Sequence, residues 1–498
     1  MTTRLAFASL RNGQTVAEHT IPATPDIASL LDAVAEQCRE GRRLANFFGH
    51  RADQGPLKLY AVVSDDKANL LWIGAATVGA SFPSLTPRCP QAHLFEREIF
   101  EQFGCRADGH PWLKPVRFPA HPHAAPIPRD YPFFQMHGEE VHEVAVGPVH
   151  AGIIEPGHFR FQCHGENVFH LEIQLGYQHR GAEILLERAA PARVPLIAES
   201  IAGDTAVGHG LASAMAWESV SGARVSARAA ALRAIALELE RLANHVGDLG
   251  AIGADVGFVP GSAYFGRLRG EFLNMLMELT GNRYGRCFVR PGGVTFDLPE
   301  TMVDSFLKRI KKAQKELKDV ANLFFDTPSV FERLDGVGTV SLQACQELGL
   351  VGPSARACGQ DYDVRNDHPY GIYRFQHIPT MTADDGDVFA RANIRRLEIE
   401  RSLEFLLSQL DNLPQGNLRA ACGPLRKHSL AIALVEGWRG EIMHTLITDG
   451  EGRISRYKVT DPSFHNWMGL AMALRDQQIS DFPLINKSFN LSYAGHDL

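Results

Sequence analysis

The chain has 498 residues, of which 45% are apolar and 21% are charged, the ordinary balance of a globular protein with room for several domains. Its 50 Lys and Arg residues against 57 Asp and Glu residues give a formal net charge of -7. This composition excludes a disordered chain. The negative net charge gives no support to a nucleic-acid-binding function. The longest nearly uncharged apolar stretch, residues 70–82, is shorter than the ~20 residues that a membrane-spanning helix needs.

The eight cysteines are scattered along the chain and include no CxxC pair. We therefore expect a reducing, cytoplasmic compartment and predict neither a disulfide framework nor a cysteine metal site. The first residues alternate apolar and polar side chains and do not form the apolar run of a secretory signal. A peripheral subunit of a membrane complex would have the same composition.

The first part of the chain has the pattern of a small α+β domain. Apolar residues at helical spacing predict a helix over 27–39, and runs of strand formers predict strands over 59–63 and 70–78. A second, shorter helix is predicted over 94–103. We assign residues 1–120 to this domain.

A proline-rich stretch follows, with seven prolines between residues 111 and 132. Proline donates no backbone hydrogen bond and favours extended chain, so we predict a domain linker over 121–145. His110, His121 and His123 lie in or near this stretch. We interpret them as solvated linker histidines, because nothing fixes their geometry for a metal.

The remainder, residues 146–498, is predicted to be mainly helical with a small sheet at its beginning. Alternation predicts a strand over 168–175, and apolar stripes predict long helices over 226–246, 301–325 and 388–413. Several such helices suggest a bundle core. The predicted fold class is therefore α+β, a small docking domain followed by a mainly helical domain.

Common catalytic signatures are missing from the sequence. It contains no GxSxG, Walker A loop, HExxH or Rossmann GxGxxG. An NAD site on this chain is therefore unsupported by its residues. Several other short strings are far more specific. They are ERE at 96–98, FG at 103–104, GHP at 109–111, RDYP at 129–132, VGPVH at 146–150, PGHFRF at 156–161, GYQHRGAE at 176–183, LELERLANH at 237–245, RPGG at 290–293, DPSFH at 461–465 and DFP at 481–483.

This series resembles two adjoining subunits of respiratory complex I fused in one chain: the small peripheral-arm subunit, then the quinone-site subunit. The second is homologous to the large subunit of nickel–iron hydrogenases. The motifs of this chain are most similar to those of the formate hydrogenlyase-type branch. The resemblance implies an iron–sulfur small subunit and antiporter-like membrane subunits as partners. It also implies that the chain lies on the inner face of the cell membrane. NAD is implied only by the name of the family.

In the hydrogenases of this family, four cysteine thiolates hold the nickel–iron centre. The resemblance places those ligand positions at Ala202, Thr205, Ser463 and Asn466. Alanine has no donor atom, and neutral oxygens are poor substitutes for thiolate. We therefore predict no metal on this chain, and no iron–sulfur cluster either, since clusters need grouped thiolates.

The quinone site of the family implies further candidates. The quinone-binding histidine corresponds to His158, with His150 as a competitor because the loop differs in length. The family's quinone-binding tyrosine corresponds to Ser200, which is shorter and far less acidic. This substitution puts ordinary quinone binding in doubt. The alternative is that His158 has no role in quinone binding and is a loop histidine whose hydrogen bonds are made locally.

Five more residues are candidates. His245 would lie next to the partner's terminal cluster and titrate with its redox state, or would simply pack between helices. Arg180 and Glu183 of the RGAE string would lie near the former metal cavity, where Glu183 could relay protons if burial raises its pKa. The alternative is a structural Arg–Glu contact. His209 and Asp204, near the same turn, are weaker candidates.

Two functions remain open from the sequence. In the first, the chain is a redox-coupling subunit, and a cavity between the hairpin of His158, residues 202–205 and residues 463–466 accepts a quinone or an unknown substrate. In the second, it is a non-catalytic scaffold that retains the hydrogenase-like shell and transmits conformational change to an ion-translocating arm.

Overall fold

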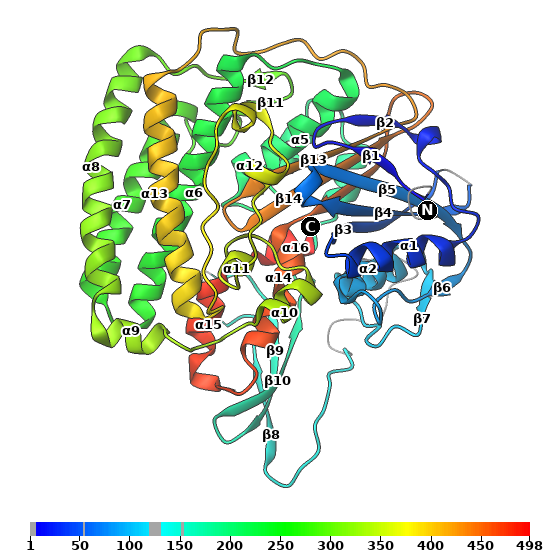
Figure 1. Ribbon diagram of the computed structural model, residues 1–498, viewed down its shortest axis with the longest axis horizontal. Helices are drawn as coiled ribbons and strands as arrows, with labels where there is room; N and C mark the ends of the chain where they lie inside the picture. Colours follow the sequence, from blue (N-terminus) through cyan, green and yellow to red (C-terminus); the bar gives the residue numbers. More distant parts are fainter. Residues whose placement is uncertain (1–5, 53–54, 119–130, 151–153) are drawn as a thin grey trace.

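The computed structural model describes residues 6–52, 55–118, 131–150 and 154–498, and it is α+β as predicted (Figure 1). The N-terminal part is built on an antiparallel sheet with the strand order β1-β5-β4-β3. Its strands are β1 (Ala8–Leu10), β3 (Arg43–His50), β4 (Leu57–Asp65) and β5 (Leu70–Val78). The two predicted strands are thus β4 and β5.

The two predicted helices of this part are also present. Helix α1 (Ile27–Arg39) begins where Asp26 accepts the backbone N–H of Ser29 at 2.7 Å, a side-chain cap that fixes its first turn. Its apolar face, including Leu30, Leu31 and Val34, is buried against the sheet. Helix α2 (His93–Phe103) ends at Gly104, which adopts a left-handed conformation with φ 69°.

Four long helices lie side by side and form the second part's bundle (Figure 1). They are α6 (Ala227–Asp255), α7 (Val259–Thr280), α8 (Glu300–Phe325) and α13 (Val388–Asp411). Three of these were predicted, with α6 longer than expected. Helix α7 was missed because its three glycines weaken the helical signal, although its buried face still recurs every three or four residues.

The described residues contain two further four-stranded sheets and two small two-stranded ones, β6 (Ser81–Pro83) with β7 (Arg106–Asp108) and β11 (Val289–Arg290) with β12 (Gly293–Val294). One has the order β16-β10-β9-β8 and contains the predicted strand as β10 (Asn167–Gln174), next to β9 (His158–His164), β8 (Val141–Val146) and β16 (Gln477–Gln478). The other has the order β15-β14-β13-β2 and was not predicted. Its strands β13 (Ser429–Gly437) and β14 (Gly440–Thr448) are buried along their whole length, so they lack the alternation by which a half-exposed strand is recognised.

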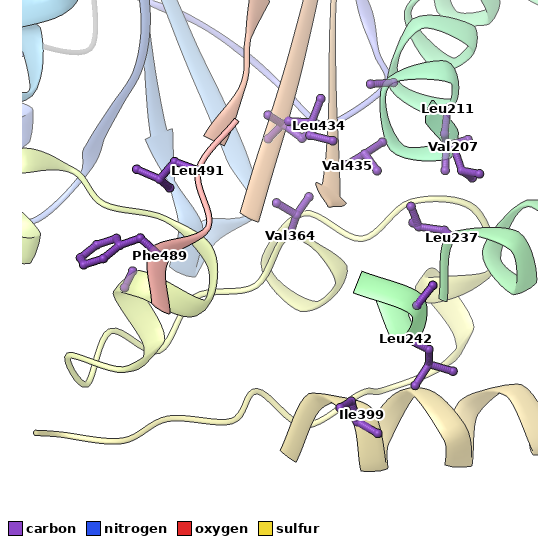
Figure 2. Packing of buried hydrophobic residues seen from close by; sticks show 14 of the residues in the cluster. Val207, Leu211, Leu237, Leu242, Val364, Ile399, Leu434, Val435, Phe489 and Leu491 are labelled. Atoms are coloured by element: carbon purple, nitrogen blue, oxygen red, sulfur yellow. The ribbon is translucent and has the colours of Figure 1, made fainter. Parts of the chain in front are cut away.

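The N-terminal and C-terminal segments share this last sheet. Strand β2 (Thr15–Ala17) pairs with β13, and β15 (Ile454–Thr460) pairs with β14. Figure 2 shows the apolar core that this arrangement encloses, with Val207 and Leu211 facing Leu434 and Val435 of β13. The chain ends inside the fold, because Leu498 is buried and its carbonyl accepts the backbone N–H of Arg180.

The proline-rich stretch is only partly described. His121 and His123 lie outside the described residues, so their interpretation remains a prediction. His110 is not solvated, because its side chain is fully buried with Nε2 3.1 Å from the carbonyl oxygen of His93. Within the described ranges, no helix has the length and apolar character needed to cross a membrane.

Candidate functional site

The two turns that correspond to the hydrogenase ligand segments meet in this fold. Helix α5 (Ala206–Ser221) follows the first turn, and α14 (Pro462–Ala473) begins at the second. His209 of α5 lies with Nε2 3.0 Å from Oδ2 of Asp461, which caps α14, and both side chains are buried. Residues 252 positions apart in the sequence are thus in direct contact.

The space between these turns is closed by hydrogen bonds of the substituted residues. Thr205 Oγ1 accepts from Trp438 Nε1 at 3.1 Å, and Ser463 Oγ accepts the backbone N–H of Ser492 at 2.9 Å. Asn466 exchanges two hydrogen bonds of 3.0 Å with the backbone of Val351. The remaining position, Ala202, is buried and has no polar atom.

Arg439 fills the room next to the first turn. Its guanidinium makes two hydrogen bonds to Asp204, of 2.7 and 2.8 Å, and its CZ atom lies 3.8 Å from the centroid of the Trp438 ring. Burial raises the pKa of Asp204, but the charge and hydrogen bonds of Arg439 outweigh this effect and hold it below its ordinary value. Asp204 is therefore a permanent carboxylate.

These residues do not fit a nickel–iron centre. Soft thiolates are absent from all four positions, and each oxygen that replaces one already has a protein partner. Among the described residues, no group of three histidine, cysteine or carboxylate side chains is arranged to hold a metal ion. We therefore assign no catalytic step of this chain to a nickel–iron centre.

An open cavity of about 770 Å³ adjoins the closed turns. We call it the outer hollow. It touches Gly203 and Asp204 of the first turn, Ser492 beside the second, and Glu155 of the β8–β9 hairpin. Its opposite wall is the turn after α7, with further lining from that helix. The residues of that wall are Arg269, Met277, Asn282, Arg283, Tyr284 and Arg286.

The outer hollow is lined by both basic and acidic residues. Arg283 and Arg286 are exposed, and the Arg283 guanidinium lies 4.9 Å from the centroid of the Tyr284 ring. Glu155 and Asp204, which is paired with Arg439, also line the outer hollow. This polar, open shape suits a charged partner or a small polar acceptor better than a long apolar chain.

The two hairpin histidines have different surroundings. His158 is buried at the start of β9, with Nδ1 3.2 Å from the Gly147 carbonyl oxygen, and Nε2 accepts from Arg160 at 3.3 Å. His150 packs near Tyr493, and its Nε2 atom has no hydrogen-bond partner. Burial lowers the pKa of both imidazoles, so both are neutral at physiological pH.

Arg180 and Ser200 make structural contacts. Arg180 donates to the carbonyl oxygens of Ser200 and Ile201, both at 2.8 Å, and thereby holds the turn before residue 202. Ser200 Oγ donates to the Ile197 carbonyl oxygen at 2.7 Å. Neither side chain lines the outer hollow.

Glu183 lies in a buried charge cluster between the two parts of the chain. It accepts from Lys458 Nζ at 3.0 Å and from Arg456 Nη2 at 2.9 Å, and Lys458 also contacts Glu98 of α2 at 2.7 Å. Arg117 completes the cluster by pairing with Glu98. Burial raises the pKa of Glu183, but these cations hold it well below its ordinary value. The raised pKa that a proton relay requires is not found.

His245 is enclosed by this chain and lies in a second charge network. Its Nε2 atom donates to Glu398 Oε2 at 2.8 Å, and Glu398 in turn accepts from Arg356 at 2.9 Å. Its Nδ1 atom has no hydrogen-bond partner. Burial lowers the pKa of His245, so the ring is neutral. The side chain has no exposed atom from which to contact a partner directly.

Sequence reasoning missed the residues that extend from His209 into the unpredicted sheet. His209 Nδ1 lies 3.1 Å from His444 Nε2, and His444 Nδ1 lies 2.9 Å from the Tyr457 hydroxyl. Asp461 can only accept, so His209 donates to it from Nε2. His444, Tyr457 and Arg439 belong to no motif. The pairing of β14 with β15 brings His444 and Tyr457 together, and Arg439 lies in the turn between β13 and β14.

Comparison with known proteins identifies the family. The family described as "Respiratory-chain NADH dehydrogenase, 30 Kd subunit" matches residues 26–136, and the corresponding 49 Kd subunit family matches 255–430 and 423–497. Formate hydrogenlyase subunit 5 of Escherichia coli is 30% identical over 487 residues, covering 92% of this chain and 85% of that protein. The chain belongs to this fused complex I-type family.

Other relatives of this fused complex I-type chain span both branches. The carbon monoxide-induced hydrogenase of Rhodospirillum rubrum is 32% identical and covers 70% of this chain and 96% of its own length. NADH-quinone oxidoreductase subunit 4 of Thermus thermophilus is 30% identical, with 70% and 92% covered. A chain of the membrane-bound sulfane sulfur reductase, an archaeal respiratory membrane complex, aligns with a TM-score of 0.68 at 25% identity, covering 72% of this chain and 99% of its own. The family resemblance predicted from the motifs is confirmed.

Proposed function

We propose that the chain is a redox-coupling subunit of a membrane-associated respiratory complex, which carries a partner iron–sulfur subunit over the outer hollow. Relatives of both branches are named as hydrogenases or quinone oxidoreductases, which supports the assembly. The observation that carries the proposal is the outer hollow, since it joins the former ligand turn at Asp204 to the hairpin at Glu155.

Electron transfer would take place at this hollow and not between the two turns. The turns are closed by Arg439 and by the partners of Thr205 and Ser463, so no acceptor fits there without breaking buried hydrogen bonds. A quinone or another small oxidant bound in the hollow would be covered by the docked partner. Tyr284 offers a ring for stacking, and Arg286 offers a hydrogen-bond donor.

Quinone reduction by the purified complex tests this proposal. With the complex's own electron donor, we expect turnover of a short-chain quinone and a lower kcat/KM in Tyr284→Ala. His158→Ala is the comparison variant, because His158 does not line the hollow. Unchanged kinetics in Tyr284→Ala, with a loss in His158→Ala, would assign the acceptor to the hairpin and contradict the proposal.

A non-catalytic scaffold is the second candidate, favoured by the complete internal pairing of the substituted ligand positions. In this case the buried cluster of Glu98, Glu183 and Lys458 would transmit movement between the two parts of the chain. A complex that assembles and translocates ions, yet reduces no acceptor at the hollow, would support the scaffold.

A further inference from the structure

Two free cysteines of the N-terminal part place their sulfur atoms 3.1 Å apart. Cys38 lies in the last turn of α1, and Cys89 immediately precedes the short helix that leads into α2. A disulfide bond is about 2.05 Å long. A movement on the order of 1 Å would therefore join these sulfurs.

Both cysteines line a groove of about 390 Å³ between the N-terminal part and the segment around helix α10 (Leu342–Leu348). A small molecule can thus approach them from solvent. The groove is lined by four arginines, Arg39, Arg42, Arg43 and Arg88, and by one acidic residue, Glu347. Arg42 and Arg88 are paired with acidic residues, while the side chain of Arg39 is exposed. This lining favours a small molecule that carries carboxylates.

The two thiols are not equivalent. Cys38 is half-buried, whereas Cys89 is buried and donates its S–H to the Cys38 sulfur. The hydrogen bond to Cys38 and burial together raise the pKa of the Cys89 thiol. Cys38 is therefore the accessible nucleophile, and Cys89 is placed to attack it in a second step.

We propose that Cys38 and Cys89 form a reversible disulfide by exchange with an anionic low-molecular-weight disulfide of the glutathione class. The Cys38 thiolate attacks one sulfur of that molecule, which breaks its S–S bond, forms a mixed disulfide and releases one thiol. Cys89 then gives up its proton and attacks the Cys38 sulfur, which releases the second thiol. Two protein thiols are oxidised and one small disulfide is reduced to two thiols, so atoms and electrons balance.

The disulfide would act at the boundary between the two parts of the chain. Gln91, two positions after Cys89, accepts the backbone N–H of Leu44 at 2.7 Å and donates to the Gln346 carbonyl oxygen at 2.9 Å. Oxidation pulls Cys89 toward α1 and so displaces the segment that makes this bridge. Transient disulfides of this kind serve redox sensing in a reducing compartment.

The test treats the reduced full-length chain with oxidised glutathione, alkylates the remaining thiols, and maps the peptides by mass spectrometry. We expect a Cys38–Cys89 link that dithiothreitol reverses. Cys89→Ser should instead accumulate glutathione on Cys38, since the resolving thiol is missing. Cys105→Ser removes another buried cysteine of the same part and should form the link normally.

Two outcomes would overturn the proposal. The first is an intact Cys38–Cys89 dithiol under conditions that modify the exposed Cys287. The second is the absence of glutathione on Cys38 in Cys89→Ser, which would show that the small disulfide does not reach Cys38. Because both readouts are chemical, they do not depend on electron transfer at the outer hollow.

Discussion

His209 of α5 and Asp461 at the start of α14 lie 3.0 Å apart, although 252 positions separate them in the sequence. This buried contact links α5 to α14. A double-mutant cycle on His209→Ala and Asp461→Ala should give a coupling energy of about 1–3 kcal/mol. Denaturant unfolding of the purified chain measures it, and additive effects of the two substitutions would show that the contact contributes nothing.

The C-terminal helix α16 (Tyr493–Asp497) packs against the same carboxylate. A Cβ atom built on Gly495 would lie 2.5 Å from Cγ of Asp461, whereas one built on Gly203 would meet nothing within 4 Å. We therefore expect Gly495→Ala to lower the free energy of unfolding by about 1–3 kcal/mol, because the buried neighbours must shift. Gly203→Ala is the matched control in the first turn. Equal stability of the two variants would contradict the packing.

Glu183 should act as a permanent anion and not as a proton carrier. Glu183→Gln leaves Arg456 and Lys458 buried with fewer counter-charges, so we expect a loss of about 3–5 kcal/mol. Glu187→Gln, at the more exposed edge of the same cluster, should cost less. Unfolding midpoints of both variants measure the difference, and a larger loss in Glu187→Gln would contradict this assignment.

The pH dependence of stability follows from the same cluster. The folded-state pKa of Glu183 lies below its unfolded value, because Lys458, Arg456 and Arg117 outweigh the opposing effect of burial. Its contribution is therefore fully present above the unfolded pKa of about 4.3 and is lost as the pH falls through the folded pKa. Wild type should lose stability more steeply than Glu183→Gln in acid. Parallel pH profiles would rule out this linkage.

The charged rim of the outer hollow gives a prediction for assembly. Replacing Arg283 and Arg286 by Glu should weaken binding of the iron–sulfur partner by about 1 kcal/mol per charge, or roughly fivefold each, with a strong dependence on salt. The matched control reverses Lys308 and Lys312 on α8, which lie away from the hollow. Co-purification and titration of the partner measure the effect, and equal affinities for the two double variants would contradict docking at the hollow.

The sequence predicted much of the local structure and less of the site. Helix 27–39 and strand 70–78 were predicted at the observed bounds, the helix from its apolar spacing and the strand from its run of strand-forming residues. The sheet of β13 and β14 was missed, since strands buried on both faces have no alternation to detect. His444 lies on β14 and Arg439 lies in the turn between β13 and β14, so their roles could not be predicted.

The substituted positions illustrate the same limit. The resemblance assigned the ligand positions to residues 202, 205, 463 and 466, none of which is a cysteine. The space between the two turns is closed by Arg439, which stacks on Trp438, and by the hydrogen bond from the Ser492 backbone to Ser463. These tertiary contacts could not be predicted from the sequence. The cavity that was expected between the turns is not found there. The open cavity is the outer hollow, which is lined by Asp204 and Arg286.

Photolabelling of the purified complex with an azido-quinone, followed by peptide mapping, tests the central claim most directly. An acceptor bound in the outer hollow should label the turn of residues 282–286, and an excess of unmodified quinone should abolish the label. Label on the peptide that contains Ser463 and Asn466 would contradict the account, because it would require an open cavity where the structure has a closed one.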